Sequence, residues 1–303
     1  MPPRTCCGGG FGARLRGESD DEARGNAALL TGAAREAGGV LTAEEIRQVE
    51  TLGHLRVPAV LDVPAVQSME DRIWRRLGNN GADRDDPSTW SADKAWGLQR
   101  IRKGDPAPTS SSRFTEAVDA LMGADAWRTQ QNWGQALVTF PSDPPWTVPG
   151  GSWHLDHPYS YPPGEIWGLN VFLIVHDLEP HGGGTGVVEG SPELIRRWLV
   201  GKDPKRSTMK QLRRGFEAKH PYFARLVDRD DPTDPAERVA DFTAPTIIDD
   251  VEVRVVEVTG RAGDVVLCHP WALHNGTPNT TAQPRLMRAC RVYRRDLYPR
   301  LAE

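Results

Sequence analysis

The stretch from Gly263 to Arg285 constrains the fold of this chain more than any other. An apolar run, Val-Val-Leu-Cys, follows a Gly-Asp turn, and the pair Asn275-Gly276 precedes a run that begins at Arg285. Such an apolar run is typical of a strand buried on both faces, and an Asn-Gly pair is typical of a tight turn. We therefore predict a buried strand, a tight turn next to a histidine, and a returning strand that carries the arginine.

A second motif, His154-Leu155-Asp156, lies upstream in an aromatic stretch flanked by glycines. Residues two apart on an extended chain point to the same face, so one metal ion can bind both side chains. Two histidines and one carboxylate form the ligand set of a non-haem ferrous centre, which keeps coordination positions open for chemistry. His269 and His274 compete for the third ligand position.

Three arginines lie on the last predicted strand. With a period of two, Arg285 and Arg291 face one way and Arg288 faces the other. A guanidinium group binds carboxylate oxygens in pairs, so an arginine near a ferrous centre suits the far carboxylate of a dicarboxylic co-substrate.

These motifs resemble the phytanoyl-CoA dioxygenase-like branch of the iron(II)/2-oxoglutarate oxygenases. The resemblance rests on residues 154–156, 182–192 and 263–285, and it extends over roughly residues 41–295. It implies a mainly β fold: a double-stranded β-helix (jelly-roll) core with supporting helices, the N-terminal helices packed on one sheet.

The resemblance also implies a site. The metal ligands would be His154, Asp156 and His274, His269 would support them from nearby, and Arg285 would bind oxoglutarate. The cofactor would be Fe(II), and the co-substrates 2-oxoglutarate and O₂, with a C–H bond of a small molecule hydroxylated as oxoglutarate becomes succinate. Halogenating relatives lack the carboxylate ligand, so a retained aspartate favours oxygenation.

One position departs from that branch. Two residues after the distal histidine the branch often has a hydroxyl side chain that helps to hold oxoglutarate, and this chain has Gly276. The side chain of Thr277 should point the other way along an extended chain. Thr139 and Thr185 are therefore the predicted alternatives for the second oxoglutarate contact.

Aromatic side chains near the motifs are the predicted substrate contacts, and packing in the core is the competing interpretation for each. Together with the neighbouring prolines they suit a compact, partly apolar small molecule. These residues are Trp146, Trp153, Tyr159, Tyr161, Trp167 and Trp271.

A basic stretch at residues 202–214 is either a solvated helix face or a clamp for an anionic group such as a CoA phosphate. Because the chain has a net charge of −4, we expect a free small molecule, with an acyl-CoA hydroxylase as the alternative within the family. The alternative from another class of enzyme is a non-oxidative metal-dependent jelly-roll isomerase or epimerase. The presence of Arg285 argues against this alternative. A binding protein on an inactive oxygenase fold is opposed by the complete ligand set.

The chain divides into a tail and a domain. Residues 1–24 have almost no aliphatic side chains and should be disordered, and residues 25–38 should form a poorly anchored helix, so the tail 1–40 should be disordered or weakly ordered. Residues 41–303 should form the oxygenase domain, with a helical insertion at about 192–250. Its first two helices should begin after Thr42, which forms a capping box with Glu45, and after Asp62.

Composition excludes several classes of protein. The net charge of −4 opposes an electrostatic nucleic-acid binder, and no apolar run approaches the roughly 20 residues of a membrane span. The first residues lack the apolar segment of a secretory signal, and the four cysteines do not form a disulfide framework. We expect a cytoplasmic protein that has neither a nucleic-acid nor a membrane partner.

Overall fold

The computed structural model describes residues 40–101, 104–143, 145–156, 166–202 and 209–296. All of them belong to one compact unit, Gly39–Glu303. The predicted tail, Tyr159, Tyr161 and the middle of the basic stretch lie outside the described residues. Among the described residues, no helix has the length and apolar character needed to cross a membrane.

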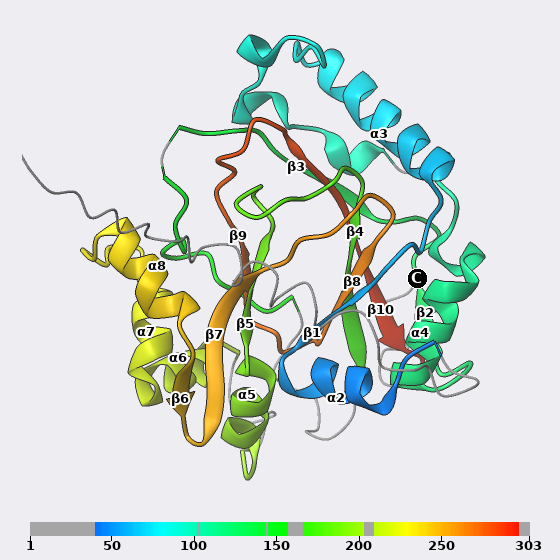
Figure 1. Cartoon of the computed structure of the whole chain (residues 1–303). Coiled ribbons are helices and arrows are strands. Elements are labelled where there is room, and N and C mark those ends of the chain that lie inside the picture. Colours follow the sequence, from blue (N-terminus) through cyan, green and yellow to red (C-terminus); the bar gives the residue numbers. More distant parts are fainter. Residues whose placement is uncertain (1–39, 102–103, 144, 157–165, 203–208, 297–303) are drawn as a thin grey trace, which may run out of the picture. The chain divides into compact units, whose positions relative to one another are not determined.

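The larger of two antiparallel sheets has six strands (Figure 1). Its order is β1-β8-β4-β10-β2, and β3 pairs with β10 beside this path. The long apolar strand β4 is buried along its whole length, as the sequence predicted. The strands are β1 (His54–Val57), β2 (Trp127–Thr129), β3 (Gln135–Thr139), β4 (Gly168–Ile174), β8 (Val265–Cys268) and β10 (Arg285–Arg294).

The smaller sheet has four strands in the order β6-β7-β5-β9. Pairing of β9 with β5 places His274 opposite Val187, and an isolated bridge then joins His274 to His154. The strands are β5 (Thr185–Glu189), β6 (Thr246–Ile248), β7 (Val251–Glu257) and β9 (His274–Gly276). Two antiparallel sheets with helices agree with the predicted mainly β class.

The predicted tight turn at Asn275-Gly276 is wrong. Both residues are extended and belong to β9, because the chain pairs there with β5 and the Asn275 side chain donates a hydrogen bond to the Gly151 carbonyl. The chain reverses later, where the Asn279 carboxylamide oxygen accepts hydrogen bonds from the backbone and hydroxyl of Thr281.

Helices cover the outer face of the larger sheet. The apolar face of α3, which includes Met69 and Ile73, shares one core with the outward side chains of β4 and β8. The predicted capping box is confirmed: Glu45 N donates to Thr42 Oγ1 at 3.1 Å, and Thr42 N donates to Glu45 Oε2 at 2.7 Å. These helices are α2 (Ala43–Thr51), α3 (Val63–Gly78) and α4 (Ser112–Met122), with short 3-10 turns η1 (Pro87–Thr89), η2 (Ala92–Lys94), η3 (Leu98–Arg100) and η4 (Pro108–Ser110).

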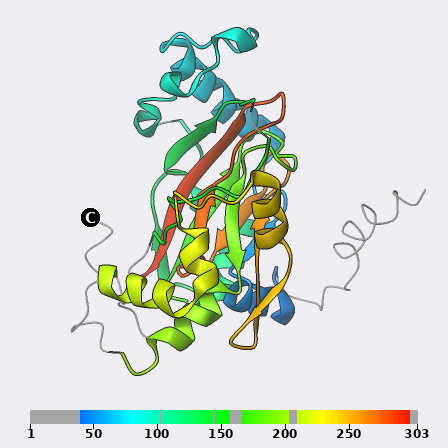
Figure 2. The same ribbon diagram turned by 90° about the vertical axis from the view of Figure 1, so that its left-hand side faces the viewer.

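Within the described residues between β5 and β6, where the insertion was predicted, the chain forms four further helices. They pack on the smaller sheet, since Leu194, Phe223 and Phe242 share a core with Val253 and Val255 of β7. Figure 2, the side view, shows them away from α3. They are α5 (Ser191–Leu199), α6 (Met209–Lys219), α7 (Pro221–Leu226) and α8 (Pro235–Thr243).

The space between the sheets is lined by alternate residues of each strand. On β4, Leu169, Val171 and Leu173 face the helices, whereas Phe172 and Ile174 face the smaller sheet. This alternation, which follows from the period of two in a strand, leaves a pocket between the sheets at one end.

Candidate metal centre

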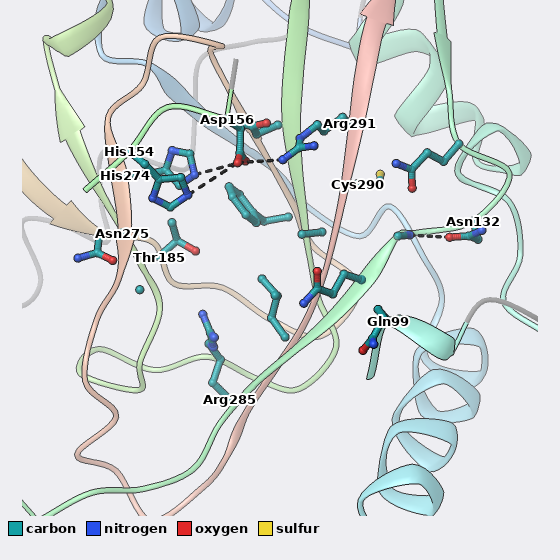
Figure 3. A pocket seen from close by; sticks show the side chains of 18 residues that line it. Gln99, Asn132, His154, Asp156, Thr185, His274, Asn275, Arg285, Cys290 and Arg291 are labelled. Atoms are coloured by element: carbon teal, nitrogen blue, oxygen red, sulfur yellow. Dashed lines mark hydrogen bonds and ion pairs between the residues drawn. The ribbon is translucent and has the colours of Figure 1, made fainter. Parts of the chain in front are cut away.

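Two histidines and one aspartate meet at the rim of the smaller sheet. His154, Asp156 and His274 offer ligand atoms that all lie within 4.8 Å of one another (Figure 3). Nε2 of His274 is 3.5 Å from Oδ2 of Asp156, and Nε2 of His154 is 3.7 Å from Oδ1. The bridge between His154 and His274 brings the two motifs together across the sequence.

Backbone carbonyls orient both imidazole rings. Nδ1 of His154 donates to the Ser152 carbonyl at 2.9 Å, and Nδ1 of His274 donates to the Ala272 carbonyl at 2.9 Å. With Nδ1 protonated, each neutral ring keeps the lone pair on Nε2, which faces the carboxylate. Burial, followed by the neighbouring His274, lowers the pKa of His154, and a neutral imidazole is the form that a metal ion binds.

Asp156 is held by an arginine that faces the same pocket. Nη2 of Arg291, on β10, lies 2.9 Å from Oδ1 of Asp156. Burial alone would raise the pKa of Asp156, but contacts with His274, Arg291 and His154 together hold it well below its usual range. The carboxylate is therefore ionised, as a metal ligand must be.

Arg285 is the other cation of the pocket, and it is buried. No carboxylate of the described residues forms an ion pair with it; its Nε has no hydrogen-bond partner, and Nη1 contacts only the Met287 sulfur at 4.0 Å. Burial lowers the pKa of Arg285 to about 10, although the charge of Glu257 acts in the opposite direction. The side chain remains charged at neutral pH.

The alternation predicted for the last strand is confirmed. Arg285 and Arg291 both line the pocket. Arg288 points to the opposite face, where it is fully buried and its Nη2 lies 2.9 Å from Oδ2 of Asp105.

The remaining predicted residues divide between the pocket and the core. Thr185 lines the pocket, and Thr139 lies opposite Arg285 in the pairing of β3 with β10. His269 accepts a hydrogen bond on Nδ1 from the Trp271 backbone and lies in a separate pocket with Trp271.

The described tryptophans that were predicted to contact substrate do not line the pocket beside the histidines. Trp153, Trp167 and Trp271 belong to the core between the smaller sheet and α5–α8, and Trp146 packs against this core and stacks on His181. Their apolar surface is used in packing.

The pocket has a volume of about 670 Å³ and is lined instead by many carboxamide side chains, which sequence reasoning missed. Asparagines and glutamines near turns usually indicate only a solvated loop, so the sequence carried no signal for their convergence. They are Gln99, Gln130, Asn132, Gln135, Asn170 and Asn275.

One family model, described as phytanoyl-CoA dioxygenase (PhyH), matches residues 49–287. The comparison with curated proteins gave no match.

Several solved structures are similar to the chain at low identity. HygX from Streptomyces hygroscopicus, solved with nickel and 2-oxoglutarate bound, has 20% identity and a TM-score of 0.47 over 84% of this chain and 87% of that one. The carbocyclase SnoK from nogalamycin biosynthesis has 16% identity and a TM-score of 0.46, with 84% of each chain covered. The epimerase SnoN, in complex with Fe³⁺, alpha ketoglutarate and nogalamycin RO, has 19% identity and a TM-score of 0.44 over 83% and 82%.

Proposed function

The chain belongs to the phytanoyl-CoA dioxygenase family of iron(II)/2-oxoglutarate oxygenases, and from this premise we propose that it hydroxylates a C–H bond of a free small molecule. In the balanced reaction, O₂ supplies one oxygen atom to the substrate and one to succinate, and 2-oxoglutarate loses CO₂. We also propose that its two sheets are the two faces of a double-stranded β-helix.

The observation that carries the proposal is Arg285, which is buried in the same pocket as the three candidate ligands and forms no ion pair with any residue that the structure describes. A buried charge without a partner is costly, because it has lost its hydration and gained no ion pair. A carboxylate that enters the pocket would supply that partner. Oxoglutarate is such a ligand, since one end can bind a metal while its far carboxylate reaches a guanidinium group.

The residues fit iron. His154, Asp156 and His274 present two imidazole nitrogens and an ionised carboxylate, a set that suits Fe(II) and leaves positions open. When bound, iron supplies the activation of O₂. The protein itself holds the ligands in place through the Ser152 and Ala272 carbonyls.

The rest of the pocket would orient the co-substrate and the substrate. Thr185, buried in the pocket lining, is the better placed of the two predicted threonines for a second oxoglutarate contact. Gly276 leaves space beside it, because a Cβ at that position would meet no neighbouring atom within 4 Å.

Anaerobic spectroscopy tests the proposal directly. Metal-free protein is mixed with Fe(II) and then with 2-oxoglutarate, and the charge-transfer absorption of the chelate should appear only when both are present. A non-oxidative isomerase would bind the metal without that absorption, and this result would overturn the proposal. Product analysis then separates hydroxylation, with a gain of one oxygen atom, from epimerisation and ring formation.

A further inference from the structure

Five carboxamides line the part of the pocket that the metal ligands and Arg285 do not occupy. They come from four segments of the chain: η3, the loop between β2 and β3, β3 itself, and β4. Figure 3 shows Gln99 and Asn132 across the pocket from His154 and His274. The five are Gln99, Gln130, Asn132, Gln135 and Asn170.

The charged residues of the pocket already have other roles. Among the described lining residues, the charged side chains other than the histidines are Asp156, Arg285 and Arg291. Asp156 is a proposed metal ligand, Arg285 is the proposed oxoglutarate partner, and Arg291 pairs with Asp156. An ammonium group would therefore meet no free carboxylate in this lining, and a CoA phosphate would meet no lysine.

The apolar part of the lining is small. Leu137, Phe172, Ala289 and Cys290 are its apolar members among the described residues. A long acyl chain needs a continuous apolar surface, because each buried methylene contributes to binding only when it leaves water for an apolar wall. The tryptophans that could build such a wall are buried in the core of the smaller sheet.

We infer that the substrate is a neutral, polyhydroxylated small molecule, such as a saccharide or a cyclitol, held by these carboxamides. This inference rests on the proposed function, whose substrate class it names. A hydroxyl group both donates and accepts a hydrogen bond, and a carboxamide offers both partners without a charge. The side chains of Gln130 and Gln135 are exposed and form no hydrogen bond within the described part of the chain, so their amides are available to a ligand.

The selectivity of the pocket for polyhydroxylated ligands follows from the free-energy cost of covering a carboxamide with a ligand group that cannot form a hydrogen bond. Asn170 is buried, whereas the side chains of Gln99, Gln130 and Gln135 are exposed to solvent, so a ligand that covers them must replace their bonds to water. A carboxamide that an apolar ligand covers loses these bonds and gains nothing. A site of this kind rejects ligands that lack the matching hydroxyl groups more strongly than an apolar pocket distinguishes ligands of different length.

The test uses full-length protein loaded anaerobically with Fe(II) and 2-oxoglutarate, whose chelate absorption shifts when a substrate binds next to the metal. The probes are a panel of neutral mono- and disaccharides and cyclitols, with glucosamine, glucuronate and palmitoyl-CoA as charged comparisons. If the chelate does not form, the proposed function has failed. If it forms, the response to the panel tests the substrate class alone.

The double variant Gln130→Leu/Gln135→Leu replaces two carboxamides of the pocket with apolar side chains of similar size. The control variant Gln131→Leu makes the same change at an exposed neighbour that does not line the pocket. We expect neutral polyols to shift the spectrum, and the double variant to weaken this response at least about tenfold while Gln131→Leu leaves it unchanged. A response to palmitoyl-CoA or glucosamine in place of the neutral polyols would overturn the inference. So would the absence of any response to the polyols, or equal binding in all three proteins.

Discussion

Nη2 of Arg291 lies 2.9 Å from Oδ1 of Asp156, so a side chain of the larger sheet fixes the carboxylate that stands between two histidines at the rim of the smaller one. The ion pair leaves Oδ2 facing Nε2 of His274. It also adds a positive charge: with Fe(II), Asp156, oxoglutarate, Arg285 and Arg291, the loaded site has a formal charge of about +1 when both histidines are neutral. Such a site favours neutral substrates over cationic ones.

Removal of this ion pair should weaken metal binding. Arg291→Ala frees Asp156 to rotate, and loss of a residue that orients a metal ligand costs about 10- to 100-fold in metal affinity. We expect a loss near the lower end, because the Arg291 side chain is 42% exposed. Arg291→Lys should recover part of the affinity. An anaerobic Fe(II) titration measures the effect, with the surface variant Arg261→Ala as the control; equal affinity in all proteins would remove the orienting role.

Alanine substitution of each of the three proposed ligands should have a different effect on activity from alanine substitution of the neighbouring His269. His154→Ala, Asp156→Ala and His274→Ala should each abolish oxoglutarate turnover and bound iron while circular dichroism remains unchanged. His269→Ala should keep measurable activity, since its ring accepts a hydrogen bond from the Trp271 backbone and does not line the pocket. An active His274→Ala together with an inactive His269→Ala would show that the wrong histidine had been assigned.

Substitution of two arginines on β10, Arg285 and Arg288, should affect different properties of the protein. Arg285→Ala removes the proposed partner of the far carboxylate, so the oxoglutarate requirement should rise at least about tenfold at unchanged iron affinity. Arg288→Ala removes one of the two arginines that pair with the buried Asp105, the other being Arg72, and leaves a cavity at a fully buried position. It should lower the free energy of unfolding without a specific effect on oxoglutarate. Oxoglutarate titrations and denaturant unfolding distinguish the two. A normal oxoglutarate response in Arg285→Ala would exclude it from the site.

Gly276 offers a gain-of-binding experiment. The position is open, and its backbone lies in a strand, so a side chain can be accommodated. Gly276→Ser restores the hydroxyl that related enzymes often have there, and one added hydrogen bond to a carboxylate should tighten oxoglutarate binding about two- to tenfold. Gly276→Ala is the control for the added Cβ and should show no gain. If both variants bind oxoglutarate equally, the hydroxyl does not reach it.

The pair formed by His176 and Glu70 should make stability depend on pH. A hydrogen bond from His176 Nδ1 to Glu70, 3.4 Å apart, raises the pKa of His176 despite partial burial. A raised folded-state pKa contributes stability that is fully present below the unfolded value of about 6.5 and is lost as pH rises through the folded pKa.

Melting temperatures should show this dependence. The difference between the unmodified protein and His176→Asn should be larger at about pH 5.5 than at about pH 8. His181→Asn serves as the matched control, since no carboxylate of the described residues pairs with its ring. A difference that does not change with pH would contradict the role of His176.

Local patterns were sufficient for much of the fold and for the core of the site. The continuous apolar runs predicted the buried strands β4 and β8, and the capping residues Thr42 and Asp62 predicted the starts of two helices. The period of two correctly separated Arg288 from its neighbours on β10. These features depend on the backbone geometry of a few adjacent residues, so the sequence carries them directly.

Features that depend on contacts between segments far apart in the sequence could not be predicted from local patterns. The Asn275-Gly276 pair would suit a tight turn locally, yet pairing with β5 keeps it extended. The tryptophans near the metal motif were equally suited to substrate and to core, and the helices α5–α8 decided this by covering them.

The sequence by itself determined which residues could form a ferrous site: the His-x-Asp spacing, the later histidine, and an arginine on the right face of the last strand. Only the tertiary structure decided what surrounds that site. The register of β10 against β3 and β4 placed Arg291 beside Asp156. The same pairing brought the side chains of Gln135 and Asn170 to the lining of one pocket. Alternation along a strand is a local property, whereas the choice of which face becomes the interior follows from how distant strands and helices pack, and that choice sets the substrate that the pocket can hold.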